Sequence, residues 1–207
     1  RLAGLVKASR GCYDFAMAYD KPFISGKDSL NNEYIVGGES LAIPGTLLVT
    51  AVAVMPDADK AVSMDLKEAG NLIYMVGLTR HELGGSEYLR HLGLIGQSVP
   101  KVDAEVGRDV FAGLSDAADQ GLVRSMHDCS EGGLAVTLAE MAFAGNLGLT
   151  AALEELPVEG QDELTAPALL FSESQSRLVA EVAPDKQIAF EAVLSKAAAP
   201  FALIGKV

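Results

Sequence analysis

The chain has 207 residues, a formal net charge of −12 and 49% hydrophobic residues, with no tryptophan. The acidity argues against a nucleic-acid partner, which would need clustered Lys and Arg, and the longest apolar run, residues 46–55, is too short to cross a membrane. Two cysteines, Cys12 and Cys129, are too few for a disulfide framework, and no signal peptide is visible, so we expect a cytoplasmic protein.

The sequence before Pro56 predicts one helix and three strands. Apolar residues at helical spacing predict a helix that ends near Asp20. Short strands are expected at residues 22–25 and 30–35, and residues 46–55, apolar on both faces, are typical of a central strand covered on both sides. We therefore expect one domain over residues 1–59 and another over 60–207. The first residue, Arg1 rather than Met, indicates a piece of a longer protein.

Strand and helix patterns alternate through the second part of the chain. Strands are predicted at residues 71–76, 123–127, 168–171, 177–182 and 201–204. A short helix should follow the turn Gly84-Gly85-Ser86, and longer helices are predicted at residues 104–120, 130–144 and 184–196. This alternation favours an α/β or α+β fold, a mixed sheet packed by helices.

Residues 127–133 have the composition of a phosphate and metal corner between a strand and a helix. Ser130 is a suitable helix N-cap, and Gly132 and Gly133 would leave backbone N–H groups open to an anion at the positive end of the helix dipole. Asp128 precedes the cap, and Mg²⁺ typically takes one or two protein carboxylates together with phosphate oxygens. His127 could hydrogen-bond a phosphate or orient the turn.

Three other interpretations of this corner stay open. A Ser cap with a Gly pair is also how an ordinary helix begins, and these residues alone favour neither interpretation. A zinc site at His127 and Cys129 is less favoured because zinc needs three or four ligands in recurring spacings. A Cys–His nucleophile pair would need a third group, so Cys129 is better interpreted as a small buried residue.

Two further loops have side chains suited to a ligand. In residues 26–29, Lys27 can neutralise phosphate charge, Asp28 can hold a metal and Ser29 can donate to an anion, although the spacing is not that of a P-loop. In residues 173–177, Gln175 could bind polar groups of a ligand and Arg177 could pair with Glu173. Each loop could equally be a polar turn.

Together these segments resemble the phosphoribosylformylglycinamidine synthase family of purine synthesis. The matching stretches run in order along nearly the whole chain: PFISGKDSLNNEY at 22–34, AVSMDLKEAG at 61–70, ELGGS at 82–86, HDCSEGGLAVTLAEMAFAG at 127–145 and FSESQSR at 171–177. The HD-x-S-E-GG turn followed by LAEMAFAG is the most specific of them. A shorter form of that turn also occurs across the wider superfamily of aminoimidazole ribonucleotide synthetase and selenophosphate synthetase.

The resemblance implies a fold and a reaction. Residues 1–59 would be the end of an ATP-binding domain, and 60–207 a synthetase C-terminal-like domain, from the second half of the duplicated protein. The family phosphorylates the formamide oxygen of formylglycinamide ribonucleotide with ATP, and ammonia from a glutaminase subunit or domain then displaces phosphate to give formylglycinamidine ribonucleotide. No catalytic residue is assigned to this chain, and the isolated chain is expected to be inactive.

The resemblance also assigns binding roles residue by residue. Mg²⁺ would be held by Asp128 and Asp28, and substrate contacted by Glu173, Ser174 and Gln175. ATP or ADP would be contacted by Gly26, Lys27, Ser29, Ser130, Gly132 and Gly133. Some relatives have an Asn metal ligand where this chain has Lys27, so Lys27 is not expected to touch the metal.

Two alternative functions follow from the same segments. The chain could be a noncatalytic module whose auxiliary ADP-Mg site holds the parent protein's shape. It could also belong to another superfamily kinase, such as a selenophosphate synthetase-like enzyme, although the Gly-rich segment with a reactive Cys is missing. Expected partners are formylglycinamide ribonucleotide, the glutaminase, the rest of the synthetase and a second copy, bound through an exposed sheet, and neither nucleic acid nor membrane.

Overall fold

A computed structural model of the protein describes residues 2–29, 32–160 and 164–207. Contacts divide the chain into two compact units, Arg1–Pro56 and Asp57–Val207. The sequence placed this boundary after residue 59 rather than 56.

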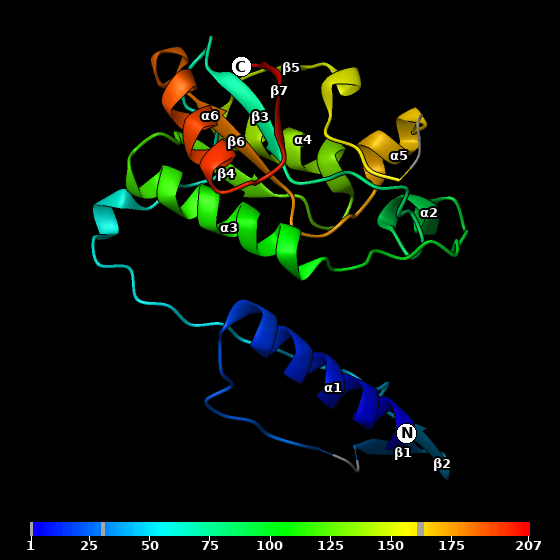
Figure 1. The fold of residues 1–207 in the computed structure, drawn as a ribbon. Helices are drawn as coiled ribbons and strands as arrows, with labels where there is room; N and C mark the ends of the chain where they lie inside the picture. The colour runs from blue at the N-terminus through cyan, green and yellow to red at the C-terminus, as the bar shows by residue number, and fades with distance from the viewer. Residues whose placement is uncertain (1, 30–31, 161–163) are drawn as a thin grey trace. The chain divides into compact units, whose positions relative to one another are not determined.

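The described residues of the first unit form a helix and a hairpin (Figure 1). Helix α1 spans Leu2–Tyr19, as its apolar spacing predicted, but none of its residues is buried. Strands β1 (Glu33–Val36) and β2 (Glu39–Ala42) pair antiparallel. Gly37 and Gly38 join them with φ of 59° and 85°, the left-handed conformation that two-residue hairpin turns require.

Three strand predictions in this unit need correction. Residues 22–25 are not a strand, and the strand expected at 30–35 is β1, which ends at Val36; Leu30 and Asn31 lie outside the described residues. Residues 46–55 form neither a strand nor a buried segment, and Val52 and Val54 are 85% and 89% exposed. A buried strand needs hydrogen-bonded neighbours on both edges, and the only pairing described in this unit is β1 with β2.

The second unit is built on a five-stranded sheet in the order β4-β6-β3-β7-β5. Its strands are β3 (Leu72–Val76), β4 (Ser125–Asp128), β5 (Thr150–Ala151), β6 (Leu178–Val182) and β7 (Phe201–Lys206). The strand pairings described in this sheet are antiparallel, and Thr79 with Val158 adds one isolated parallel bridge. The α/β prediction is confirmed, with an antiparallel rather than a mixed sheet.

Helices complete the second unit. They are α2 (Glu87–His91), α3 (Ala104–Asp119), α4 (Gly133–Gly145), α5 (Ala166–Phe171) and α6 (Gln187–Lys196), with short 3₁₀ turns η1 (Ala58–Lys60), η2 (Leu153–Glu155) and η3 (Pro184–Lys186). The strand predicted at 168–171 was wrong, because these residues belong to α5. Pro167 lies in the first turn of that helix, where its fixed φ is favourable.

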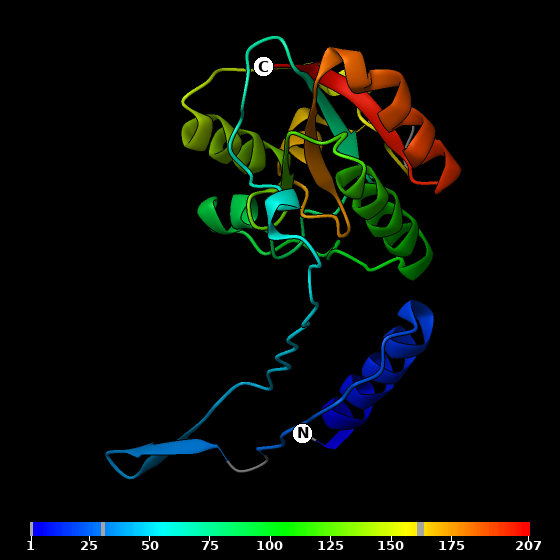
Figure 2. The ribbon, with the colours of Figure 1, turned by 90° about the vertical axis from the view of Figure 1, so that its left-hand side faces the viewer.

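Helices cover both faces of this sheet. In Figures 1 and 2, α3 and α6 lie on one face and α4 on the other. Side chains alternate along β3, so Leu72, Tyr74 and Val76 join the core beneath α3 and α6, whereas Ile73 and Met75 join the core beneath α4. The sheet therefore separates two apolar cores, and β3 contributes to both.

One buried carboxylate fastens this sheet to the segment before β3. Glu181 on β6 is fully buried, and its two oxygens accept hydrogen bonds from the backbone N–H groups of Lys67 and Glu68, from Asn71 Nδ2 and from Ser125 Oγ, at 2.7–3.1 Å. A buried charge is tolerated when donors surround it in this way. No local pattern marks this strand position as one that would hold a buried carboxylate.

Among the described residues, no helix is long and apolar enough to cross a membrane.

Candidate functional site

The predicted corner joins β4 to α4. Asp128 ends the strand, and the chain turns through Gly132 and Gly133, whose φ values are 84° and 63°. Helix α4 begins at Gly133 with Gly132 as N-cap, so the prediction that Ser130 caps the helix was wrong. A Cβ on Gly133 would lie 2.4 Å from the carbonyl oxygen of Ser172, so close backbone packing by itself requires glycine there.

A chain of side-chain contacts runs across this corner. His127 Nε2 lies 2.9 Å from Glu140 Oε2, and His127 Nδ1 lies 3.2 Å from Asp128 Oδ1. Ser130 Oγ donates to the other carboxylate oxygen of Asp128. Sequence reasoning missed Glu140, because nothing in its spacing marks a partner for His127.

The fold favours the ionised form of the Asp128 carboxyl group. The hydrogen bond from Ser130 is the main reason that the pKa of the Asp128 carboxyl lies below its ordinary value; partial burial opposes this shift and His127 adds to it. The side chain is 62% exposed, so it remains accessible to a ligand. The structure thus brings Asp128 and Ser130 together as an exposed carboxylate with its own hydrogen-bond donor.

The Glu173 carboxylate accepts a backbone hydrogen bond at the start of α4. Its Oε1 accepts from Gly132 N–H at 2.9 Å and from Glu87 N–H, at the start of α2, at 2.9 Å. The N–H of Gly133 donates to the carbonyl of Ser130 at 3.0 Å. The backbone donors expected to be open to an anion are therefore already bonded, and an internal carboxylate holds one of them.

The rest of the 173–177 loop divides into buried and exposed parts. Ser174 is buried, and its Oγ accepts from Arg80 N–H at 3.1 Å, whereas Gln175 is exposed and donates to the Glu173 carbonyl at 3.1 Å. The expected pairing of Arg177 with Glu173 is replaced by three other hydrogen bonds: the buried guanidinium donates to Ser174 O, Thr79 Oγ1 and Ser172 O. Of the three predicted substrate contacts, only Gln175 points to solvent.

Cys129 is buried, as its small apolar character indicated. Burial raises the pKa of its thiol, which disfavours the nucleophilic thiolate.

The loop at 26–29 belongs to the first unit. It is an exposed coil in which Lys27 Nζ donates to the Asp28 carbonyl at 2.7 Å and to Ser29 Oγ. Gly26, Lys27, Asp28 and Ser29 are therefore close to one another, and the Asp28 carboxylate belongs to a separate unit from Asp128.

The metal-binding capacity of the corner suits Mg²⁺ better than zinc. Among residues 2–29, 32–160 and 164–207, no three His, Cys, Asp or Glu side chains are grouped so as to hold a metal. A zinc site needs such a group, whereas Mg²⁺ is commonly held by one or two carboxylates and by oxygens of a phosphate ligand. Asp128 fits the second pattern.

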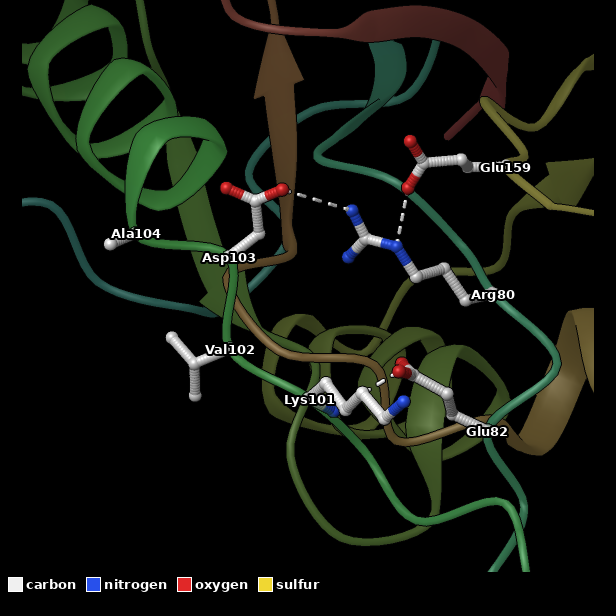
Figure 3. Close-up of a pocket in the computed structure, with 7 residues that line it drawn as sticks. All are labelled: Arg80, Glu82, Lys101, Val102, Asp103, Ala104 and Glu159. Atoms are coloured by element: carbon white, nitrogen blue, oxygen red, sulfur yellow. Dashed lines mark hydrogen bonds and ion pairs between the residues drawn. The ribbon is translucent and has the colours of Figure 1, made fainter. Parts of the chain in front are cut away.

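A pocket that sequence reasoning did not find lies beside Arg80 (Figure 3). Its volume is about 450 Å³, and its lining comprises Arg80, Glu82, Lys101, Val102, Asp103, Ala104 and Glu159. These residues come from the segment after β3, the start of α3 and the loop after η2. Their separation along the chain hides the pocket from any reading of local patterns.

Known proteins resemble this chain over most of its length. The family described as AIR synthase related protein, C-terminal domain, matches residues 68–207. The phosphoribosylformylglycinamidine synthase subunit PurL of Deinococcus radiodurans is 36% identical over 98% of this chain. The chain spans 27% of the length of that subunit.

Solved structures share the fold. Thermotoga maritima PurL complexed with FGAR covers 72% of this chain and 26% of its own, at 22% identity and a TM-score of 0.63. The same protein complexed with ATP covers 72% of this chain and 23% of its own, at 21% identity and a TM-score of 0.59. The predicted resemblance is thus found in sequence and in fold, and the chain belongs to the family of AIR synthase related proteins, C-terminal domain.

Proposed function

We propose that this chain is part of a phosphoribosylformylglycinamidine synthase, the ligase that converts formylglycinamide ribonucleotide, ATP and ammonia into formylglycinamidine ribonucleotide, ADP and phosphate. The observation that carries the proposal is the 36% identity to a PurL subunit over 98% of the chain. The similar structures of Thermotoga maritima PurL complexed with ATP and with FGAR support the choice of substrates.

In this proposal the corner at the start of α4 binds the phosphates of the nucleotide. Asp128 stays ionised because Ser130 donates to it, so it is suited to hold Mg²⁺ against a phosphate. Mg²⁺, when bound, would neutralise charge on the phosphate oxygens.

Glu173 determines access to this corner. A phosphate oxygen that accepts from Gly132 N–H must take the place of Glu173 Oε1, which lies 2.9 Å from that nitrogen. The displaced carboxylate keeps its bond to Glu87 N–H, so its release costs one charge-assisted hydrogen bond rather than two. Glu173 would then act on nucleotide affinity, in place of or beside the substrate contact expected of it.

The remaining assignments complete the proposal. Gly26, Lys27, Asp28 and Ser29, in a first unit that would be the end of an ATP-binding domain, contact nucleotide or metal, and the exposed Gln175 contacts the substrate. The rest of the synthetase and a glutaminase supply the other active-site residues and ammonia. The reaction takes place in the cytoplasm.

The proposal is tested in the complete protein that contains this chain. Asp128→Asn removes the carboxylate charge while keeping its size, and we expect it to weaken ADP-Mg²⁺ binding at least tenfold, about 1.4 kcal/mol. Asp185→Asn, an exposed carboxylate 4.0 Å from Lys186 Nζ, is the matched control and should bind as the native protein does. Failure of the complete protein to form formylglycinamidine ribonucleotide from its three substrates would refute the ligase assignment.

A noncatalytic nucleotide module is the second candidate. The internal hydrogen bonds of Glu173 and Ser174 favour it, because two of the three residues expected to contact substrate are engaged within the fold. The same Asp128→Asn variant separates the two. Retained synthetase turnover with a lowered Tm would support the structural role, whereas a loss of kcat of about 100-fold would support a catalytic one.

A further inference from the structure

The Asp128 carboxylate is contacted at both of its oxygens. Ser130 Oγ donates to Oδ2, and His127 Nδ1 lies 3.2 Å from Oδ1. A carboxylate that is held on both sides cannot rotate about its Cβ–Cγ bond without breaking one of the two contacts. It can still accept from a ligand, because a carboxylate offers about four lone-pair sites. The direction in which Asp128 faces a ligand therefore depends in part on what holds the His127 ring.

The main chain at Asp128 is fixed by the fold. Asp128 pairs with Leu178 of β6. The next N–H along the chain, that of Cys129, donates to the Arg177 carbonyl at 2.9 Å. Thr137 Oγ1, buried in α4, lies 3.1 Å from the Asp128 carbonyl oxygen. Both β6 and α4 thus hold the backbone beneath the carboxylate, so the orientation of the site is decided by side chains.

The far side of the His127 ring faces Glu140. His127 Nε2 lies 2.9 Å from Glu140 Oε2, and a ring nitrogen that carries hydrogen donates to the carboxylate it faces. Glu140 is on α4, about two turns after Gly133, where the helix begins. The Glu140 side chain is 49% exposed, whereas that of His127 is 17% exposed. The half-buried ring is therefore the link between Glu140 and Asp128.

We propose that Glu140 is a positioning residue of the nucleotide corner: it orients the His127 ring, which in turn directs the Asp128 carboxylate. This inference rests on the proposed function, in which Asp128 holds Mg²⁺. Residues that hydrogen-bond to the ligands of a metal fix the orientation of those ligands, and their loss typically lowers metal affinity by about 10- to 100-fold. Glu140 acts through the ring and not on the nucleotide, so it is not a catalytic residue.

A carboxylate at this position could also attract Mg²⁺ through its charge alone, without any contact with His127. Two variants separate contact from charge. Glu140→Ala removes both, and α4 should persist because alanine is the most favourable helix residue. Glu140→Gln removes the charge but keeps a side chain of the same length with polar atoms that can hold the ring.

The first readout needs neither nucleotide nor metal. The mobility of the His127 ring is measured by carbon-13 NMR relaxation in the 207-residue chain, with the exposed His81 and His91 rings as internal references. We expect the native His127 ring to be more ordered than either reference. Its order should fall toward theirs in Glu140→Ala and stay near the native value in Glu140→Gln. Glu154→Ala, which changes an exposed carboxylate outside the corner, should leave it unchanged.

The second readout is the affinity of the complete protein for ADP-Mg²⁺. Glu140→Ala should weaken binding about tenfold, whereas Glu140→Gln and Glu154→Ala should bind nearly as the native protein does. In a His127→Ala background, Glu140→Ala should cause no further loss, because the ring through which it acts is gone.

Three results would each overturn the positioning role of Glu140. The His127 ring could keep its native order in Glu140→Ala, Glu140→Gln could lose as much affinity as Glu140→Ala, or the loss could persist in the His127→Ala background. In all three cases Asp128→Asn still weakens ADP-Mg²⁺ binding. Failure of the proposed function is a different result, because Asp128→Asn then binds ADP-Mg²⁺ as the native protein does.

Discussion

A run of apolar residues is exposed in the first unit of this chain and buried in the second. Residues 46–55 of the first unit are exposed along their whole length, whereas every residue of β3 in the second unit is buried. Both segments are runs of aliphatic residues. The difference lies in their neighbours: β3 is paired on both edges, by β6 and β7, and has a helix layer on each face. An apolar run thus predicts burial only when partner strands are folded beside it.

The largest effect should come from removing the buried hub of the second unit. Glu181→Ala leaves the N–H groups of Lys67 and Glu68, Asn71 and Ser125 without their acceptor, and should lower the free energy of unfolding by about 3–5 kcal/mol. Urea unfolding followed by β-sheet circular dichroism measures this loss. A decrease below about 1 kcal/mol would mean that water replaces the carboxylate as acceptor, and would contradict the stabilising role of Glu181.

A smaller loss is expected from the corner. Gly133→Ala places a Cβ 2.4 Å from the Ser172 carbonyl oxygen at a φ of +63°, and should destabilise the second unit by about 2 kcal/mol. Gly148→Ala is the matched control, because no atom lies within 4 Å of its added Cβ. If thermal unfolding gave the two variants the same Tm, the close packing of the corner against the 172 segment would be refuted.

The exposed run in the first unit should promote self-association. Leu48 and Val52 are 88% and 85% exposed, and replacing both with Lys should lower the self-association measured by sedimentation velocity. Ile188→Lys is the control: it removes a side chain of the second unit that is also 85% exposed, and should leave the self-association unchanged. A native chain that sediments as a monomer at high concentration would contradict this prediction.

The smallest effect concerns the titration of Asp128. Because Ser130 lowers the folded-state pKa, the contribution of this carboxylate to stability is complete above its ordinary pKa of 3.8 and is lost as the pH falls through the folded value. Ser130→Ala should move the pKa back toward 3.8, as seen by carboxyl-carbon NMR. An unchanged midpoint would assign the shift to His127 instead.

Local signals were sufficient where local interactions decide the structure. The strands β3 and β6 and the helix α3 were predicted within a few residues of their bounds. In the structure Asp103 caps the start of α3, and Gly121, with φ of 66°, follows its end. Residues 168–171 show the limit of such signals. Four apolar residues fit a strand or a helix equally well, and Pro167 decided for the helix.

The candidate site was foreseen in part. Asp128 and Ser130 were placed together by adjacency, which the sequence shows directly. Glu173 and Gly132 meet through the tertiary fold, so a loop predicted to bind substrate proved to cap a helix. Arg80, Glu82 and Lys101 carried no local signal, because the pocket exists only where three distant segments converge.

One oxygen of Glu173 accepts hydrogen bonds from the starts of α2 and α4 at the same time, and so joins the two helices. In the proposed function, a phosphate that takes the place of Glu173 at Gly132 N–H would leave this oxygen to Glu87 N–H, at the start of a helix that the ligand does not touch. Binding at the corner would then be coupled to the start of α2, and that coupling would be reciprocal. Whatever steadies α2 would in turn make the corner easier to fill.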